Sequence, residues 1–307
     1  MSHFLSAADL TRERALHLFR VTADLKQRRK AGRFGTALHG RTLALIFEKP
    51  SLRTRVTFEV GIVQLGGRAV HLSGLEIGMG TRESVPDVAR NLSRWVDGIA
   101  ARVYAHQTVE SLARHASIPV INGLSDYEHP CQALADYFTL WERGLDLARV
   151  RLTWLGDGNN VCHSLLLLGA LLGTRMTVGC PPGYEPDLRV IETVRQLGGQ
   201  VTVTSDTREA ATDADVVYTD VWTSMGQESE RERRLEAFQR YQVNDAVMRF
   251  ARPRALVMHC LPAHRGEEIT DAVLDGETSI VLDQAENRLH AQKAIVLDLL
   301  GASVDDA

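Results

Sequence analysis

The stretch Thr42-Leu-Ala-Leu-Ile-Phe47 decides the fold class. A short continuous apolar run of this kind is typical of a strand that is buried on both faces, as in a parallel sheet covered by helices. Similar runs follow at residues 69–72, 98–104, 118–121, 150–155, 176–179, 201–204, 215–219, 255–260 and 279–282. Most of them are separated by stretches with helical periodicity, which indicates βαβ units. The sequence therefore predicts an α/β protein with doubly wound parallel sheets.

Chain length and one break in this alternation predict two domains. A chain of 307 residues is long enough for about two domains, each with its own core. Between Pro130 and Leu147 the sequence reads as one long helix, for which Gly144 is a suitable C-cap. We expect a first domain over residues 1–145, a second over residues 146–286, and a cleft between them. Residues 287–307 are predicted to form a C-terminal helix that crosses back to the first domain.

Composition excludes several classes of protein. Hydrophobic residues make up 44% and charged residues 24%, which is typical of a globular protein. The net charge of -4 lacks the basic excess of a nucleic-acid-binding protein, so nucleic acid is not an expected partner.

The apolar run at residues 165–172 is far shorter than the roughly 20 residues of a membrane helix. Charges near the N-terminus argue against a secretory signal, so we expect a cytoplasmic protein with no membrane partner. The four cysteines include no CxxC pair, which argues against a zinc site and a disulfide framework.

The segment after the first strand predicts an anion site. It reads Glu48-Lys-Pro-Ser51-Leu-Arg53-Thr54-Arg55, a turn that leads into a helix whose first turn carries a hydroxyl group and two arginines. Helix N-termini offer free N–H groups, and guanidinium groups bind phosphate through two parallel hydrogen bonds. The alternative is a surface helix whose arginines pair with Glu48 and Glu59. Arg102 lies inside a buried strand run and needs an anionic partner, which a bound phosphate would supply.

A histidine and a glutamine flank the start of the long helix. The chain reads His129-Pro130-Cys-Gln132. Because proline keeps the preceding residue extended and favours the first helical turn, we expect His129 and Gln132 to face the same site. The alternative for a lone histidine is a structural residue whose hydrogen bonds are satisfied within the fold.

Three loops in the second half follow predicted strands, and ligands of doubly wound folds bind at the carboxyl ends of strands. Gly156-Asp-Gly-Asn-Asn160 resembles part of a dinucleotide-binding turn but lacks the third glycine, so its asparagines either contact a small polar ligand or cap a helix through Asp157 or Asn159. Asp220-Val-Trp-Thr-Ser224-Met225-Gly226 offers a carboxylate and a hydroxyl group, with an ordinary loop as the alternative. His259-Cys260-Leu261-Pro262-Ala-His264-Arg265 places a cysteine beside two histidines and an arginine, where it could act as a nucleophile or contact a polar group.

Together these motifs resemble the ornithine carbamoyltransferases, a branch of the aspartate/ornithine carbamoyltransferase family. The motifs match the family in order and spacing along nearly the whole chain: Ser51-Leu-Arg53-Thr54-Arg55, His129-Pro-x-Gln132, Gly156-Asp-Gly-Asn-Asn160, Asp220-x-x-x-Ser224-Met225-Gly226 and His259-Cys260-Leu-Pro262. The first two motifs are shared with aspartate carbamoyltransferases. The Ser-Met-Gly loop and the cysteine of His-Cys-Leu-Pro resemble the ornithine branch.

The resemblance implies an activity and a set of site residues. It implies transfer of the carbamoyl group of carbamoyl phosphate to the δ-amino group of L-ornithine in arginine biosynthesis, giving L-citrulline and phosphate, by a homotrimer without metal or cofactor. The implied catalytic residues are Arg102, His129, Gln132, Asp220 and Cys260. Those implied for carbamoyl phosphate are Ser51, Leu52, Arg53, Thr54, Arg102, His129, Gln132, Cys260, Leu261 and Arg288, and those for ornithine are Asn160, Asp220, Ser224 and Met225.

Two departures from the family pattern keep alternatives open. Leu52 stands where the family usually has threonine, and Gly78 stands where many members have a glutamine or histidine that reaches the phosphate of a neighbouring subunit. One alternative is a carbamoyltransferase for a related amine, such as putrescine or an acylated ornithine. A second is an NAD-dependent oxidoreductase built on residues 156–160. A third is a carbamoyl phosphate sensor without turnover.

Overall fold

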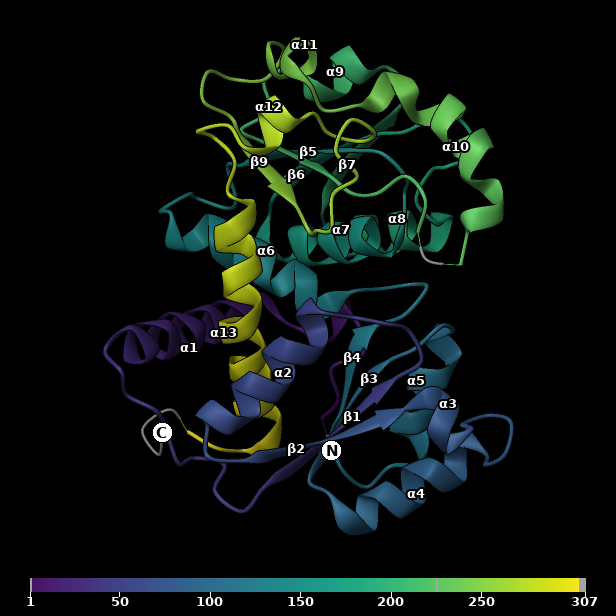
Figure 1. Cartoon of the computed structure of the whole chain (residues 1–307). Coiled ribbons are helices and arrows are strands. Elements are labelled where there is room, and N and C mark those ends of the chain that lie inside the picture. Colours follow the sequence, from purple (N-terminus) through teal and green to yellow (C-terminus); the bar gives the residue numbers. More distant parts are fainter. Residues whose placement is uncertain (1, 225, 304–307) are drawn as a thin grey trace. The chain divides into compact units, whose positions relative to one another are not determined.

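The computed structural model describes residues 2–224 and 226–303, and the chain divides into two compact units (Figure 1). Unit 1 comprises residues 1–142 and 286–307, and unit 2 comprises residues 143–285. Each unit contains a parallel sheet with helices on both faces. The predicted class, an α/β protein with two doubly wound parallel sheets, is confirmed.

The sheet of unit 1 has the strand order β2-β1-β3-β4. Its strands are β1 (Thr42–Phe47), β2 (Arg68–Ser73), β3 (Gly98–Arg102) and β4 (Val120–Leu124). One face is covered by α4 (Val85–Trp95) and α5 (His106–His115), where Ile46 and Ile99 pack with Leu92 and Leu112. Burial of each such side chain contributes about 1.5–3 kcal/mol, so this apolar layer fixes the strands that carry the site.

The other face of this sheet is covered by four helices (Figure 1). They are α1 (Arg12–Lys30), α2 (Arg53–Gln64), α6 (Pro130–Glu142) and α13 (Val281–Leu300), the last of which belongs to unit 1 from Glu286 onward. A Cβ atom on Gly61 of α2 would lie 3.1 Å from Cγ of Lys293, so this glycine permits the close packing of α2 against α13. Asn287 of α13 donates from Nδ2 to Oγ1 of Thr139 in α6 at 2.9 Å. The C-terminal helix therefore returns to the first unit, as predicted. The short elements η1 (Ala7–Asp9) and α3 (Gly74–Ile77) complete this unit.

The sheet of unit 2 has the order β7-β6-β5-β8-β9. Its strands are β5 (Arg151–Leu155), β6 (Arg175–Gly179), β7 (Gln200–Thr204), β8 (Val216–Thr219) and β9 (Leu256–His259). One face carries α7 (Asn160–Leu172) and α8 (Leu188–Gln196), and the other carries α9 (Thr207–Ala211), α11 (Asp245–Met248) and α12 (Asp271–Leu274). The remaining elements are η2 (Glu228–Glu230), α10 (Arg231–Phe238) and η3 (Gln239–Tyr241).

One predicted strand is wrong. Residues 279–282 were expected to form a strand, but Ser279 makes an isolated bridge with Val257 and α13 begins at Val281. Ile280 and Val281 are both buried. The apolar run therefore reflects burial at the start of a helix, which periodicity cannot distinguish from a short buried strand. Each of the other predicted runs overlaps an observed strand.

None of the helices in residues 2–224 and 226–303 combines the length and the apolar character that a membrane span requires.

Candidate active site

In unit 1, the predicted anion-binding residues lie at one edge of the sheet. The β1–α2 turn carries Ser51, whose Oγ accepts a hydrogen bond from the backbone N–H of Thr54 at 3.2 Å and so caps the first turn of α2. Arg102 ends β3 and is buried. In the parallel register Phe47 pairs with Arg102, so the end of β3 lies beside the residue from which the turn departs. The fold therefore places a buried guanidinium group close to the start of α2.

Two residues of the same motif face solvent. The Leu52 side chain is 73% exposed. Arg55 is also exposed, and its Nε lies 3.9 Å from Oε2 of Glu59, one turn further along α2. Both arginines lie in the first turn of α2, as expected. Arg53 is half-buried, whereas Arg55 follows the alternative of a surface ion pair.

Three elements of unit 1 meet through a chain of hydrogen bonds. Gln132 lies in the first turn of α6, and its Oε1 accepts a hydrogen bond from Nη1 of Arg288 in α13. Nη2 of Arg288 donates to Oγ1 of Thr54 in α2 at 2.9 Å. All three side chains are buried. The fold therefore brings together residues 54, 132 and 288, which are far apart in sequence.

His129 lies immediately before α6 in a strongly cationic environment. Burial lowers the pKa of His129 well below its usual value, and the charges of Arg288, Arg102 and Arg53 lower it further. The imidazole is therefore neutral near pH 7, with one nitrogen as a donor and the other as an acceptor. Three guanidinium groups that act on one buried residue create a positive potential suited to a phosphate dianion.

In unit 2, Asn159 has a structural role. Its Oδ1 caps α7 by accepting hydrogen bonds from the N–H groups of Val161 at 3.0 Å and Cys162 at 3.1 Å. Its Nδ2 donates to Oδ2 of Asp220 at 2.9 Å. The helix-cap alternative is therefore correct for Asn159. Asn160 is the first residue of α7 and is half-buried.

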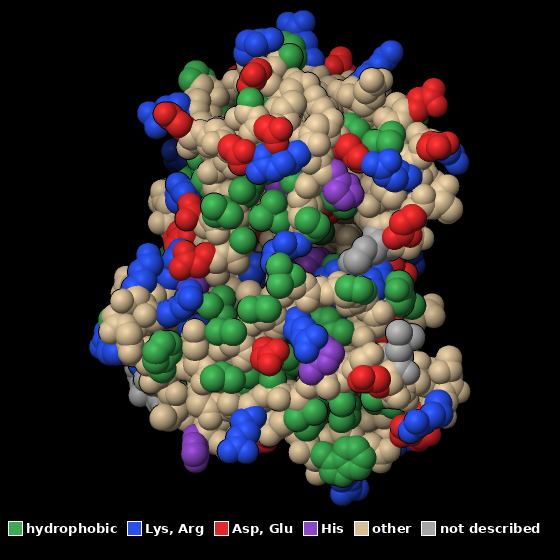
Figure 2. Space-filling view, in the orientation of Figure 1, with side chains coloured by type: hydrophobic (Ala, Val, Ile, Leu, Met, Phe, Trp, Pro, Cys, Tyr) green, Lys and Arg blue, Asp and Glu red, His purple; other side chains and the backbone are tan. Residues whose placement is uncertain are grey.

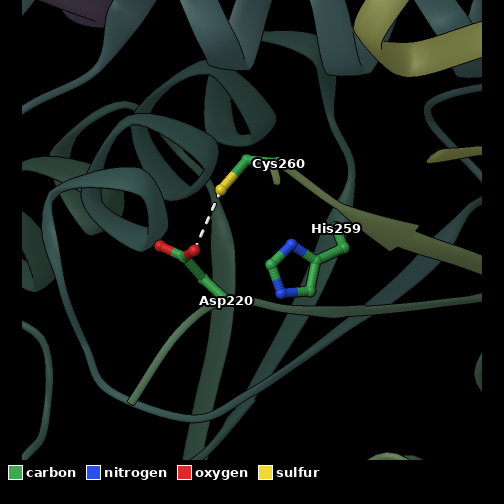
Figure 3. A group of neighbouring side chains, drawn as sticks. All are labelled: Asp220, His259 and Cys260. Carbon is green, nitrogen blue, oxygen red and sulfur yellow. Dashed lines mark hydrogen bonds between the residues drawn. The ribbon is translucent and has the colours of Figure 1, made fainter. Parts of the chain in front are cut away.

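Asp220 and Cys260 form a pair at the ends of neighbouring strands (Figure 3). Asp220 follows β8 and Cys260 follows β9, and the parallel register pairs Thr219 with His259. The Cys260 thiol donates to Oδ1 of Asp220 at 3.0 Å. Because a carboxylate disfavours a second negative charge nearby, this contact argues against a thiolate nucleophile.

The basic residues near Cys260 are paired with acidic residues. Nε2 of His259 lies 3.0 Å from Oε1 of Glu268, and both side chains are fully buried. The N–H of Leu261 donates to Nδ1 of His259 at 2.8 Å, so Nε2 carries the ring proton and donates it to Glu268. His264 pairs with Glu267, and Arg265 pairs with Asp271 and Asp275. Of the two alternatives for Cys260, these contacts argue against a thiol activated by its basic neighbours, because the side chains of the two histidines and the arginine are directed to carboxylates.

Leu261 has an uncommon backbone conformation. Its φ of +56° lies in the left-handed region. For a leucine this conformation is strained, and such strain persists where the surrounding structure determines it, often at functional sites. The hydrogen bond from its N–H to His259 is one such constraint.

The loop that follows Asp220 is anchored by a residue that the sequence did not reveal. Arg234 of α10 is buried, and its Nη1 donates to Oδ2 of Asp157 at 2.8 Å and to the carbonyl oxygen of Trp222 at 2.9 Å. Burial raises the pKa of Asp157, although the charge of Arg234 opposes this shift. Arg234 lies in a charged run typical of a solvated helix, which hid its role. Ser224 is half-buried, and its N–H donates to Oε1 of Gln227 at 3.2 Å, whereas Met225 lies outside the described residues.

The turn at residues 156–160 does not fit a dinucleotide. A Cβ atom on Gly158 would lie 2.2 Å from the backbone N of Pro186, and the N–H of Gly158 donates to the carbonyl oxygen of Tyr184 at 2.8 Å. In a dinucleotide-binding turn this close approach is reserved for the pyrophosphate. Here the chain itself occupies the space, which argues against the oxidoreductase alternative.

Among the described residues, two groups have the donor types and spacing of a metal site: Asp220, His259 and Cys260, and His264, Glu267 and Glu268. Within the first, Cys260 bonds to Asp220, and His259 of the first bonds to Glu268 of the second. These hydrogen bonds account for the proximity of the side chains without an ion.

Comparison with known proteins decides the family. Residues 2–142 match the family model described as "Aspartate/ornithine carbamoyltransferase, carbamoyl-P binding domain", and residues 148–299 match "Aspartate/ornithine carbamoyltransferase, Asp/Orn binding domain". The chain belongs to the aspartate/ornithine carbamoyltransferase family.

Relatives within the aspartate/ornithine carbamoyltransferase family include proteins similar over nearly the whole chain. An ornithine carbamoyltransferase from Archaeoglobus fulgidus is 50% identical over 301 residues, which cover 98% of each chain. The solved structure of an ornithine carbamoyltransferase from Pyrococcus furiosus is 49% identical, with a TM-score of 0.94 and coverage of 97% of each chain. A solved N-acetyl-L-ornithine transcarbamylase is 34% identical, with a TM-score of 0.86 and coverage of 97% of this chain and 100% of the other.

Proposed function

We propose that this chain is an ornithine carbamoyltransferase, which transfers the carbamoyl group of carbamoyl phosphate to the δ-amino group of L-ornithine and releases L-citrulline and phosphate. The observation that carries this proposal is the buried cationic site of unit 1, in which Arg288, Gln132 and Thr54 are joined beside a neutral His129. Sequence identity of 49–50% over nearly the whole chain to proteins of that name supports the choice of ornithine.

In the proposed site, unit 1 binds carbamoyl phosphate. The N–H groups at the start of α2 and the side chains of Ser51, Arg53, Thr54 and Arg102 hold the phosphate, with Leu52 contributing only its backbone. Arg102 and His129 donate to the carbamoyl oxygen, Gln132 accepts from the carbamoyl NH2 group, and Arg288 lies behind Gln132 and holds it in place. Donors preorganised toward a developing oxyanion contribute roughly 3 kcal/mol each in well-studied enzymes.

Unit 2 binds the amine in this proposal. Asn160, Asp220, Ser224 and Met225 hold ornithine, and Cys260 and Leu261 line the reacting centre. Asp220 is a buried carboxylate, which suits an amino group, and its bonds from Asn159 and Cys260 fix its position. Cys260 orients the attacking amine and forms no covalent bond, because a phosphate leaving group already activates the carbamoyl carbon.

The reaction needs two bond changes at one carbon. The lone pair of the unprotonated δ-amine attacks the carbamoyl carbon, and a tetrahedral intermediate forms. The bond to the phosphate oxygen then breaks, the phosphate leaves with the electron pair, and the nitrogen gives its extra proton to an oxygen of the departing phosphate. The arginines of unit 1 stabilise the charge on the departing phosphate, and binding both substrates supplies the entropic part of the rate increase. No step requires a metal or an organic cofactor.

A colorimetric citrulline assay tests the proposal, with carbamoyl phosphate and a panel of L-ornithine, Nα-acetyl-L-ornithine, putrescine and L-aspartate; carbamoylated products are separated by chromatography. We expect product with L-ornithine at a kcat/KM at least about 100-fold above any other amine, the scale on which a site rejects a substrate that leaves its polar groups unpaired. A higher kcat/KM with another amine would identify a different carbamoyltransferase. Binding of carbamoyl phosphate without any turnover would indicate a sensor.

We also propose that the enzyme is a homotrimer, as its family resemblance implies. One face of α2 supports self-association, because Leu52, Val56, Val60 and Val63 recur at helical spacing and are exposed. Figure 2 shows hydrophobic side chains gathered over this helix. Contiguous exposed apolar patches of this kind mark interaction surfaces. Light scattering should give the mass of a trimer for the wild type and a smaller mass for Val63→Glu, and a monomeric wild type with full activity would contradict the proposal.

We place the reaction in arginine biosynthesis and in the cytosol. A relative from Pyrococcus furiosus that is 50% identical is named an anabolic ornithine carbamoyltransferase. Expression of this chain should restore growth without arginine to a host that lacks its own ornithine carbamoyltransferase. Failure of an active, soluble protein to do so would count against the biosynthetic role.

A further inference from the structure

Asp136 lies behind the proposed carbamoyl phosphate site and takes part in its hydrogen bonds. It is one helical turn beyond Gln132 on α6, and its side chain is completely buried. Its Oδ1 accepts a hydrogen bond from Nε2 of Gln132 at 2.7 Å. The chain of contacts in unit 1 therefore runs from Asp136 through Gln132 to Arg288 and Thr54.

We propose that Asp136 is a positioning residue for carbamoyl phosphate, which fixes the orientation of the Gln132 amide and, through it, the guanidinium group of Arg288. This inference deepens the proposed function and rests on the assignment of Gln132 and Arg288 to that substrate.

The donor and acceptor types explain how the orientation is fixed. An ionised carboxylate only accepts hydrogen bonds, so Gln132 must turn its NH2 group toward Asp136. The carbonyl oxygen of Gln132 then faces Arg288, which only donates. If the amide turned over, its NH2 group would face the guanidinium group and its oxygen would face the carboxylate, so both contacts would be repulsive. One acidic residue thus selects one of the two amide orientations.

The same contacts connect the carboxylate to the phosphate-binding helix. Arg288 donates with Nη1 to Gln132 and with Nη2 to Thr54, in the first turn of α2. A guanidinium group held by two acceptors from two helices has a defined plane, which a planar carbamoyl group requires. Because these hydrogen-bonded side chains are buried in unit 1, each contact is strengthened by the low local dielectric.

Asp136→Asn is the most informative change. The asparagine has nearly the same shape, but its side chain can donate as well as accept, so it no longer selects one orientation of Gln132. It also replaces a charge-assisted hydrogen bond with a neutral one about half as strong. The probe is phosphonoacetamide, a stable analogue in which a methylene group replaces the bridging oxygen of carbamoyl phosphate. We expect its Kd, measured by calorimetry, to rise about tenfold, which corresponds to about 1.4 kcal/mol.

A double-mutant cycle separates positioning from a general structural role. If Asp136 acts through Gln132, then Asp136→Asn should change the Kd less than about twofold in a Gln132→Ala background, because residues that act through one contact are not additive. The matched control is Thr139→Val. Thr139 is also fully buried on α6 and bonds to Asn287 of α13, but it takes no part in the hydrogen bonds that connect Asp136, Gln132 and Arg288. We expect this control to lower Tm with less than about a twofold change in Kd.

Kinetics give the second readout. With saturating ornithine, Asp136→Asn should raise KM for carbamoyl phosphate and lower kcat, and it should leave KM for ornithine unchanged. Additive effects in the cycle, or a wild-type Kd in Asp136→Asn, would overturn the inference. Absence of phosphonoacetamide binding to the wild type would overturn it together with the assignment of unit 1. Analogue binding with the expected cycle but no citrulline formation would overturn the ornithine assignment alone.

Discussion

The two units build their proposed binding residues by different means. In unit 1 three helices supply Thr54, Gln132 and Arg288, and two hydrogen bonds join these helices: Gln132 of α6 to Arg288 of α13, and Arg288 to Thr54 of α2. In unit 2 Asn160 begins α7, but Asp220 follows β8 and Ser224 belongs to the loop after it. The first arrangement holds side chains by helix packing, whereas the second presents them on connecting segments.

This difference predicts where binding and specificity reside. A network of buried, charged groups tolerates little change, because removal of one partner leaves another without compensation. Loops accept substitutions more readily and are the usual location of substrate discrimination. Unit 1 should therefore determine whether carbamoyl phosphate binds, and unit 2 should determine which amine reacts with it.

Removal of Arg102 should have the largest effect. Arg102 is a buried guanidinium group at the end of β3, proposed to contact both phosphate and carbonyl oxygen. Arg102→Ala should lower kcat/KM for carbamoyl phosphate on the order of 100- to 1000-fold, as expected for loss of an oxyanion donor. Steady-state kinetics measure this loss, and circular dichroism checks that the variant folds. Near-normal kcat/KM in a folded Arg102→Ala would remove this residue from the site.

Substitution of Cys260 should have a smaller effect. A serine keeps a hydrogen bond to Asp220, so Cys260→Ser should retain activity within about tenfold of the wild type, whereas Cys260→Ala, which loses a bond to a charged group, should fall by roughly 10- to 100-fold. The order of the three proteins in kcat is the readout. Mass spectrometry of enzyme quenched during turnover should show no carbamoyl group on Cys260. A trapped S-carbamoyl group on Cys260 would contradict the positioning role.

A buried histidine of unit 1, His290, should make the stability of the fold sensitive to acid. Burial, and then the charges of Lys293 and of cations on α1, lower the pKa of His290 from its ordinary value of about 6.5 to about 3. Between these two values the unfolded chain binds a proton that the folded chain does not, so stability falls as the pH falls below about 6.5. His290→Met has no imidazole at this position and therefore lacks this dependence of stability on pH. Between pH 7 and pH 5 the wild type should lose about 2 kcal/mol more free energy of unfolding than the variant. Parallel stability profiles, obtained by urea denaturation, would show that His290 is not responsible.

Much of the fold could be predicted because parallel strands buried on both faces leave continuous apolar runs, as at Thr42–Phe47. The exception at residues 279–282 arose because a buried helix start leaves the same signature over a few residues. The motif residues after each run were accessible to the same reasoning, since strand ends of a parallel sheet meet at one edge.

The remaining details depend on tertiary contacts that a linear pattern does not contain. Whether Asn159 caps a helix or contacts a ligand depends on the partners of its amide, which are Asp220 and the N–H groups of α7. Arg234 lies in a charged run and Asp136 in a helical one, and neither pattern marks the side chain as buried. Their burial depends on packing between segments that are far apart in sequence.

Titration of phosphonoacetamide by calorimetry into four proteins tests the division between the two units most directly. They are the wild type, Arg53→Ala, its exposed neighbour Arg55→Ala, and Asp220→Asn in unit 2. Loss of a charge-assisted contact should raise the Kd of Arg53→Ala about 10- to 100-fold. Arg55→Ala, which loses only a surface ion pair, and Asp220→Asn should stay within about twofold of the wild type. Asp220→Asn should nonetheless form almost no citrulline. Equal weakening of analogue binding by Asp220→Asn and Arg53→Ala, or unchanged binding in Arg53→Ala, would contradict the account.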